Sequence, residues 1–513
     1  MAVAARVPEV LARVEPYRQD LSKKSHIILG NEYEELLFAE LERNLPAGEF
    51  FEFVRENQSV EASLEAMRRG VPVIAQAMFS HTFGDFEWLG YADLLVREDY
   101  ELLVAEDGSL TAAKSSGEIS PKPRPKYVVW DVKSSKKESP KYWKQIAGYA
   151  EFLQLHGLAS EQPVGVVLAG REFVRADVTE GIRAMRQSRD LLFNLLRQTN
   201  PDTITAAFSP MDCCAERHIC EDLYCNYPDL CAKIRYDRDT LEQLPSGLPQ
   251  HRAALAAAGV FTTRELAVWP SDRPVSDLDD KLLQKYIRWS QVIQKEREAG
   301  PYFEKLANPA QVGLPAASSG DLYFDIEWFN PLEQEELIFM FGVVDADSKF
   351  TAFLAHNAQE ERQAFEQFVA LAIAKLNDDP YAHIYHYDSP EPNRLRKLAV
   401  RYQTCQAEVR RIVESMIDLK VVAKASIMPG CAGYSIKQLE RYYQAGSLLN
   451  RGGLVKGGDD AMYQYNLYRQ QIAQGEDVLA AQTLQIILDY NRDDCLSTKL
   501  LAEWLDSLNT NEG

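Results

Sequence analysis

The amino-acid composition of the chain excludes several classes of protein. It has no excess of positive charge, because 56 lysines and arginines stand against 76 aspartates and glutamates, a formal net charge of −20 over 513 residues. This balance excludes a histone-like or polybasic protein that coats nucleic acid through bulk charge, although a nucleic-acid enzyme needs positive charge only locally. With 46% hydrophobic and 26% charged residues, a disordered, collagenous or coiled-coil chain is also excluded.

Long apolar runs are missing as well. No apolar stretch approaches the roughly 18–20 residues that span a bilayer. The N-terminal segment does not resemble a secretory signal, because it carries charges at Arg6, Glu9, Arg13 and Glu15. We therefore expect a cytoplasmic protein with no membrane partner. The phosphate-binding loop G-x-x-x-x-G-K-S/T is absent too, so no ATP-driven motor is evident and a separate helicase partner is expected to do any unwinding.

Cysteine is scarce and unevenly placed. The chain has eight cysteines, none before Cys213, and five of them fall between Cys213 and Cys231. Thiols stay reduced in the cytoplasm, so such crowding indicates a metal site rather than disulfides. The spacing is not the C-x-x-C of a typical zinc ribbon.

Hydrophobic periodicity outlines the organisation of the chain. A prior of about 150 residues per domain suggests three domains. The polar stretch 108–126 lies between two strand-like runs and reads as a long hairpin loop. Apolar spacing predicts helices and strands: helices over 141–157, 177–198 and 491–508, and strands over 164–170, 321–328 and 337–345. Between the two mixed regions, 238–300 reads as short helices joined by turns, and 308–320 has the composition of a linker.

A first group of chemically active residues follows two strand-like runs. Asp93 lies in GYADLL, and Asp131 and Lys133 lie two apart in YVVWDVK. Residues i and i+2 of a strand point to one face, and an acid beside a lysine on an apolar strand is costly unless it has a task. Two carboxylates brought together by a hairpin can hold Mg²⁺, and the lysine can orient a water. This is the equipment for hydrolysis of a phosphodiester.

The surroundings of this group are basic. Residues 122–144 hold eight lysines and arginines against two acids, interleaved with aromatic side chains. Such a mixture suits a groove that follows a nucleic-acid backbone and stacks bases, although a solvated basic loop has the same composition.

Asp93, Asp131 and Lys133 belong to an ordered set of seven residues that resembles the PD-(D/E)XK nuclease motif in its RecB-like exonuclease branch, related to CRISPR-associated RecB-like exonucleases. The resemblance covers roughly residues 20–235 and rests on Gly30, Glu34, Asp93, Asp131, Lys133, Gln145 and Tyr149. It implies that Glu34, Asp93 and Asp131 hold Mg²⁺ or Mn²⁺ and that Lys133 acts on the water. Gln145 and Tyr149, as Q-x-x-x-Y on the next helix, would position the strand or support the lysine.

The same resemblance bears on the cysteines. Many RecB-like nucleases carry an iron–sulfur cluster just after the nuclease core, which implies a 4Fe–4S cluster here. The favoured ligands are Cys214, Cys220, Cys225 and Cys231, with Cys213 as the fifth candidate. The relatives usually place one ligand near the N-terminus, whereas here all would be local. Zn²⁺ and buried, metal-free thiols remain alternatives.

A second group of acids lies in the last third of the chain. Asp325 and Glu327 alternate in FDIEWF, and Tyr490 and Asp494 lie four apart in DYNRDDC, a spacing that shares one helix face. This order resembles the DnaQ-like, RNase H-fold exonucleases with four metal-binding acids and a tyrosine, over about 320–507. The resemblance implies that the acids hold two Mg²⁺ or Mn²⁺ ions and that Tyr490 orients the attacking water.

The middle acid of this set is less regular. Glu391 lies four residues before Leu395 and is favoured by spacing, with Asp388 as the alternative. A glutamate departs from the usual aspartate there. Asp418 resembles the aspartate that begins a later strand in these exonucleases, and we expect it to contact the metal ligands rather than the metal. Lys437, in GYSIKQLE, either meets a phosphate or is a solvated helix lysine.

Together these patterns predict a multidomain α/β chain. We expect a PD-(D/E)XK restriction-endonuclease-like α/β domain over 1–237, a helical linker over 238–312 and an RNase H-like α/β exonuclease domain over 313–513. The linker resembles a helix-hairpin-helix module, although a plain helical spacer fits equally well.

The predicted function is a metal-dependent DNA nuclease with two nuclease domains. It is expected to be an exonuclease on single-stranded or end-bearing DNA, in repair, processing or defence. A DNA-end-binding scaffold with one or both sites inactive, and an RNA-directed nuclease, are the alternatives.

Overall fold

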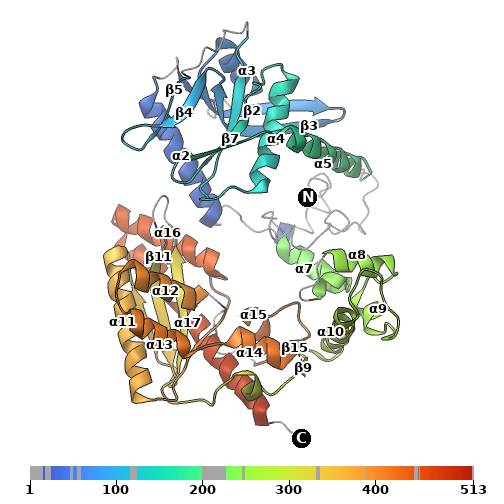
Figure 1. Ribbon diagram of the computed structural model, residues 1–513, viewed down its shortest axis with the longest axis vertical. Coiled ribbons are helices and arrows are strands. Elements are labelled where there is room, and N and C mark those ends of the chain that lie inside the picture. The colour runs from blue at the N-terminus through green and yellow to red at the C-terminus, as the bar shows by residue number, and fades with distance from the viewer. Residues whose placement is uncertain are drawn as a thin grey trace. The chain divides into compact units, whose positions relative to one another are not determined.

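The computed structural model describes most of the 513-residue chain: residues 15–17, 25–46, 50–54, 59–115, 124–198, 227–244, 249–330, 335–388, 390–443, 449 and 451–510. The chain forms two compact units. The first comprises 1–11, 26–207 and 331–334, and the second 12–25, 208–330 and 335–513. In Figure 1 the described elements of the first unit run from blue to teal, and those of the second, apart from the short blue helix at residues 15–17, run from green to red.

The first unit is built on a mixed six-stranded sheet of order β1-β2-β3-β6-β7-β8. Its strands are β1 (Phe51–Phe53), β2 (Val73–Phe83), β3 (Phe86–Arg97), β6 (Tyr127–Val132), β7 (Val164–Leu168) and β8 (Glu172–Ala176). The pairs β1–β2 and β6–β7 are parallel, and the other neighbours are antiparallel. Strand β6 is buried along its whole length, which fits a central strand covered on both faces.

Helices cover both faces of this sheet. They are α2 (Ser25–Asn44), α3 (Val60–Arg69), α4 (Pro140–Leu155) and α5 (Thr179–Gln198). Alternation along β6 sends Tyr127 and Val129 into the core beneath α3, α4 and α5, and Trp130 into the core beneath α2. The two-sided burial explains why this strand reads as a continuous apolar run.

The predicted loop over 108–126 is only partly correct. Leu110–Lys114 forms strand β5, which pairs antiparallel with β4 (Tyr100–Val104). The turn between them uses Gly108 at φ +84°, a left-handed conformation that glycine adopts without strain. Leu110 is fully buried in the core beneath α2, so its burial outweighs the polar composition around it.

The second unit begins with a helical segment. Its elements are η2 (Glu15–Tyr17), α7 (Pro228–Asp237), η6 (Leu241–Gln243), α8 (Pro249–Ala257), α9 (Thr263–Ala267) and α10 (Asp280–Ala299). Leu255, Leu266 and Trp289 share one core between α8, α9 and α10. The prediction of short helices joined by turns is confirmed for this segment. Residues 245–248, which belong to the part that resembles a helix-hairpin-helix module, lie outside the described residues.

The rest of the second unit is built on a mixed five-stranded sheet of order β12-β11-β10-β13-β14. Its strands are β10 (Leu322–Phe329), β11 (Leu337–Asp345), β12 (Phe350–Leu354), β13 (Ile384–His386) and β14 (Met416–Asp418). The first three strands by chain order are antiparallel neighbours, and β13 and β14 add parallel strands on the far side of β10. Strand β10 is therefore central.

The two faces of this sheet carry different helices: α11 (Ala358–Asp378), α12 (Pro390–Arg401) and α13 (Gln406–Glu414) on one, and α14 (Leu419–Ser426), α16 (Gly458–Gln474) and α17 (Asp477–Ser507) on the other. Leu322, Phe324 and Ile326 of β10 face α11. The alternating residues of β10 therefore face α17, which runs along the other side (Figure 1).

A short antiparallel pair joins the helical segment to the sheet region. β9 (Phe303–Lys305) pairs with β15 (Ile427–Pro429), and the Trp289 indole N–H donates to the Pro429 carbonyl at 2.8 Å. Lys305 Nζ donates to the Leu508 carbonyl at 2.6 Å. The remaining short elements are η7 (Pro309–Val312), α15 (Ile436–Leu439) and η9 (Leu508–Thr510).

The expected helices at α4, α5 and α17 and the strands at β7, β10 and β11 are confirmed. Among the helices that the structure describes, none is both long and apolar enough to cross a membrane.

Candidate active site

Two acids emerge side by side from the central strand of the five-stranded sheet. Asp325 and Glu327 lie two apart on β10 and therefore share the face turned toward α17. Glu327 is only 3% exposed. The register of β10 on β11 shifts directly after Glu327, and such irregularities re-aim side chains next to functional sites.

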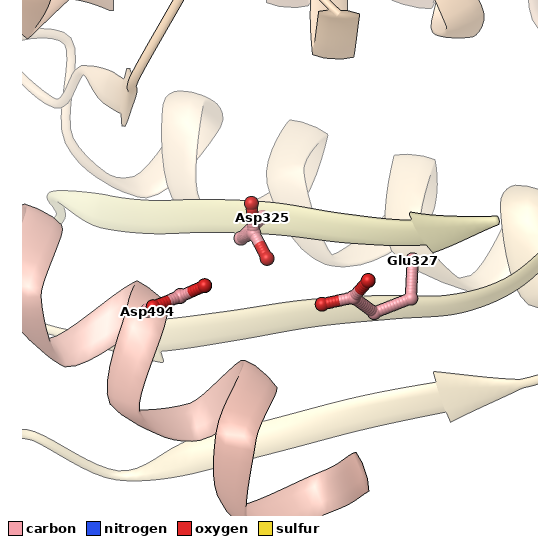
Figure 2. Close-up of side chains that lie close together, drawn as sticks. All are labelled: Asp325, Glu327 and Asp494. Carbon is pink, nitrogen blue, oxygen red and sulfur yellow. The ribbon is translucent and has the colours of Figure 1, made fainter. Parts of the chain in front are cut away.

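Helix α17 brings a third acid to the pair. Among the described residues, Asp325, Glu327 and Asp494 form the one group of three potential metal-ligating side chains whose ligand atoms all lie within 4.8 Å of one another. Figure 2 shows the three carboxylates turned toward a common region between the strand and the helix. The packing of α17 on β10 thus brings Asp494 next to two acids that lie more than 160 residues earlier in the sequence.

The electrostatics of this group favour a bound cation. Burial raises the pKa of Glu327 to about 8, and the charge of Asp494 contributes to the rise. Burial also raises the pKa of Asp325 well above its ordinary value, with further contributions from Glu327 and Asp494. Buried carboxylates that repel one another are stabilised by a divalent cation, and oxygen ligands suit Mg²⁺ or Mn²⁺. The donor set therefore fits such an ion.

A buried asparagine organises the two strand acids. Asn491 Nδ2 donates to Asp325 Oδ2 at 2.8 Å and to Glu327 Oε1 at 3.5 Å. Asn491 is fully buried, opposite Gly342 of β11, which pairs with Asp325. A Cβ at Gly342 would lie 1.6 Å from Asn491 Oδ1. The glycine therefore makes the room in which the amide sits.

Tyr490 lies one helical turn before Asp494. Its hydroxyl hydrogen-bonds Asp494, and burial together with the nearby carboxylates raises the pKa of the phenol. Lys437 Nζ, from α15, donates to the Tyr490 hydroxyl at 3.2 Å and lies 4.8 Å from the centre of its ring. The lysine of the GYSIKQLE segment is thus placed at the acidic group rather than in solvent.

Glu391 lies at the start of α12 and outside the group of three. It is 4% exposed, and its Oε2 is 3.3 Å from His386 Nδ1. Burial raises the pKa of Glu391, partly offset by His386, and its charge acts on Asp325. The alternative acid, Asp388, is ion-paired with Lys420. The assignment of Glu391 as the fourth acid stays a prediction.

Asp418 behaves as an N-terminal cap. Its Oδ1 accepts the backbone N–H of Lys420 at 2.8 Å and that of Asp388 at 3.1 Å. It therefore fixes the start of α14 and the backbone at Asp388, and its expected role next to the metal ligands stays a prediction.

The residues of the first constellation meet in the first unit. Asp93 of β3 and Asp131 of β6 flank Lys133, whose Nζ lies 2.5 Å from Asp131 Oδ2 and 3.9 Å from Asp93 Oδ2. Asp93 Oδ2 also accepts the Val132 backbone N–H at 2.7 Å. Burial raises the pKa of Asp131, and Asp93 raises it further, while Lys133 lowers it. Burial lowers the pKa of Lys133, but Asp131 and Asp93 more than offset this, so the pKa is raised.

The other residues predicted for that site lie around it. Gln76 Nε2 donates to Glu34 Oε2, on α2, at 3.4 Å. The charge of Glu34 contributes to the raised pKa of Lys133. Gln76 has φ +54°, a strained value for a strand residue of this kind. On α4, Gln145 Nε2 is 3.4 Å from the Tyr149 hydroxyl. In the described part of the chain, Glu34, Asp93 and Asp131 do not converge as closely as the acids of the second unit, so their metal-binding role stays a prediction.

The predicted cluster cysteines fall mainly beyond what the structure describes. Cys213, Cys214, Cys220 and Cys225 lie outside the described residues. Cys231 is buried in α7. Within the described ranges no group of cysteines gathers, and the iron–sulfur cluster stays a prediction.

Sequence reasoning missed two residues at the second site, Asn491 and Arg451. Arg451 is ion-paired with Asp494. Asn491 carried a usable signal, because it lies three residues before Asp494 on α17, a spacing that shares one helix face. Arg451 carried none, since it comes from a loop more than 40 residues away in sequence.

Comparison with known proteins identifies one region. Residues 322–506 match the RNase H superfamily, and this stretch is therefore an RNase H superfamily domain, whose fold implies a nucleic-acid substrate and phosphodiester chemistry. No curated protein and no solved structure matches the chain. No comparison identifies the family of the N-terminal region, so the RecB-like PD-(D/E)XK domain stays a prediction.

Proposed function

We propose that the chain is a metal-dependent nuclease whose RNase H-like domain hydrolyses DNA from an end, as an exonuclease. The observation that carries the proposal is the convergence of Asp325, Glu327 and Asp494 within 4.8 Å, beside Tyr490. A cluster of one buried and two partly buried acids with a tyrosine at its edge has no evident structural purpose, because each charge removed from water costs stability unless a cation compensates it.

In this proposal Asp325, Glu327 and Asp494, with Glu391, would hold Mg²⁺ or Mn²⁺. The bound ions supply Lewis-acid activation of water and neutralise charge on the phosphate. Asn491 fixes the carboxylates of Asp325 and Glu327 through its amide. The Tyr490 hydroxyl, held between Lys437 and Asp494, orients the attacking water.

The first unit supports a second hydrolytic site. The Lys133 ammonium lies between the carboxylates of Asp93 and Asp131, and a lysine beside two acids is the arrangement that the PD-(D/E)XK resemblance implies. Glu34, Asp93 and Asp131 would hold Mg²⁺ or Mn²⁺ there, Lys133 would act on the water, and Gln145 and Tyr149 would position the strand. The rival readings are a DNA-end-binding scaffold with one or both sites inactive, and an enzyme directed at RNA.

A cleavage assay separates these readings. Single- and double-stranded DNA and RNA, labelled at the 5′ or 3′ end, are incubated with Mg²⁺ or Mn²⁺ and the wild-type protein, Asp325→Asn or Lys133→Met. Loss of the metal ligand Asp325 is expected to lower the rate at its site by more than about 100-fold, since even changes to groups that orient metal ligands cost about 10–100-fold. Loss of Lys133, which would act on the water, is expected to lower the rate at the other site by about 100- to 10,000-fold. Asp489→Asn, which removes an exposed α17 carboxylate paired with Arg492, is the matched control.

The pattern of loss identifies the active site or sites. If Asp325→Asn cleaves every substrate like the wild type, the RNase H-like site is not the nuclease; if Lys133→Met does so, the first unit is not. A protein that binds DNA ends but cuts nothing with either metal is a scaffold.

The proposal includes four further parts. The cysteines between Cys213 and Cys231 would hold a 4Fe–4S cluster, with zinc as the alternative, and anaerobic purification followed by visible absorption and metal analysis distinguishes them. The domains would divide at 237 and 312, and the protein would act in the cytoplasm. A helicase would act in trans, which co-purification tests.

A further inference from the structure

Arg451 links two carboxylates at the edge of the acidic group. It lies in the segment between β15 and α16. Its Nη1 is 2.5 Å from Asp494 Oδ1, and its Nη2 is 2.5 Å from Glu440 Oε1. Its Nε lies 3.1 Å from the same Glu440 oxygen. The guanidinium therefore holds Glu440 by two N–H groups and Asp494 by a third, which only a planar fork of donors can do.

Glu440 is itself anchored in the protein interior. The Ser497 hydroxyl donates to Glu440 Oε1 at 2.8 Å, and the Tyr443 hydroxyl lies 3.0 Å from Ser497 Oγ. Glu440 is 9% exposed and Ser497 is fully buried. A continuous polar chain thus runs from Tyr443 through Ser497, Glu440 and Arg451 to a carboxylate of the candidate metal group. Buried networks of this kind fix one arrangement when every member is satisfied.

We propose that Arg451 is a positioning residue for Asp494. By holding Oδ1, it fixes the orientation in which the Asp494 carboxylate, which also accepts the Tyr490 hydroxyl, faces the cation held with Asp325 and Glu327. The inference rests on the proposed function, because it requires a divalent ion at this group. It adds a role for residues of the 430–457 segment that the four-acid resemblance does not contain.

Two effects of Arg451 on cation binding oppose each other. Its positive charge repels a divalent ion, whereas its hydrogen bond orients the ligand. The charge is matched by Glu440 at the same distance as Asp494, so the Arg451–Glu440 pair adds little net repulsion. The loss of groups that orient metal ligands weakens binding by about 10–100-fold. Orientation therefore outweighs repulsion, and removal of Arg451 weakens metal binding.

Manganese titration of the metal-free, full-length protein by calorimetry tests this inference. All proteins carry Asp131→Asn, so that the acids of the first unit add no second binding event. Arg451→Met is compared with the unaltered second site, with Asp494→Asn, and with Arg492→Met. Arg492 lies on α17 and pairs with Asp489 and Asp493 rather than with Asp494, which makes it the matched control.

Arg451→Met is expected to bind Mn²⁺ about 10–100-fold more weakly, and Arg492→Met to bind like the parent protein. Because Arg451→Met leaves the Glu440 charge unpaired, a variant with Glu440→Gln in addition keeps the test interpretable if the single change impairs folding. Glu440→Gln alone, which loosens the inner anchor of Arg451, is expected to weaken binding by a smaller factor.

Each outcome has one meaning. Unchanged or tighter Mn²⁺ binding by folded Arg451→Met overturns the positioning role, the tighter case showing that repulsion dominates. If the parent protein and Asp494→Asn bind Mn²⁺ equally, or neither binds it, the metal site of the proposed function fails instead. Arg451→Lys, which keeps the charge but not the fork, is expected to resemble Arg451→Met.

Discussion

Replacing Gly342 by alanine tests the packing beneath the candidate metal group. The added Cβ would lie 1.6 Å from Asn491 Oδ1 and 2.7 Å from its Cγ, far inside any permitted contact. Asn491 is fully buried on α17, so the amide has no solvent to move into. The methyl group must therefore displace the amide that donates to Asp325 and Glu327.

The magnitude follows from two losses and a small gain. Overpacking a close-packed core costs about 1–3 kcal/mol, and leaving the buried amide of Asn491 without its hydrogen-bond partners costs about 1–3 kcal/mol. Alanine recovers about 0.4–1 kcal/mol through the unfolded chain. We expect Gly342→Ala to be less stable by about 2–5 kcal/mol and to bind Mn²⁺ about 10–100-fold more weakly, because Asn491 no longer orients the acids.

Thermal unfolding and Mn²⁺ titration measure the two effects. Gly458→Ala is the matched control, because a Cβ there meets no atom within 4 Å. The double variant Gly342→Ala/Asn491→Ala removes the clash and is expected to be no less stable than Asn491→Ala alone, a coupling that additive effects cannot produce. Wild-type stability and metal affinity in Gly342→Ala would refute the reasoning.

Three further predictions concern charged groups. Because burial raises the pKa of Glu327 to about 8 from an ordinary 4.5, the metal-free protein is expected to lose stability as the pH rises from about 4.5 to 8; Glu327→Gln should flatten a plot of melting temperature against pH. Lys437→Met should slow cleavage by acting through Tyr490, so adding Tyr490→Phe should cost little more, and additive losses would show that the lysine acts separately. Lys133→Met leaves Asp131 buried without its cation and should destabilise the first unit by about 3–5 kcal/mol, whereas Lys133→Met/Asp131→Asn should recover much of that loss in urea unfolding.

Local patterns predicted the parts of the site that lie on single elements. Asp325 and Glu327 follow from the two-residue repeat of a strand, and Tyr490 and Asp494 from the four-residue spacing of a helix. The RNase H superfamily match over 322–506 confirms the expected RNase H-like domain in this part of the chain. Periodicity places each pair on one face of its element, and the resemblance to DnaQ-like exonucleases implies their role.

Features set by tertiary contact were not predictable. The fit of Asn491 against Gly342 requires the register of β10 on β11 and the position of α17 above them. Arg451 reaches Asp494 only through the path of the loop before α16. The polar composition of 108–126 predicts a loop, but the burial of Leu110, on which strand β5 depends, is set by its contact with α2. In each case the deciding partner is distant in sequence.

The pairing of β9 with β15 has a consequence for cutting the chain into pieces. Phe303 packs on Trp504 at 5.0 Å between ring centres. The Lys305 ammonium donates to the Leu508 carbonyl, and the Ala310 backbone N–H donates to the Asn509 side-chain oxygen. Phe303, Lys305 and Ala310 precede the family match, which begins at residue 322, and Leu508 and Asn509 follow its end at residue 506. A fragment trimmed to the match would lose an edge strand and uncover Trp504. Because Trp289 of α10 donates to Pro429 and packs on Tyr434, a piece that keeps its own hydrophobic surface covered starts no later than α10 and extends through Asn509.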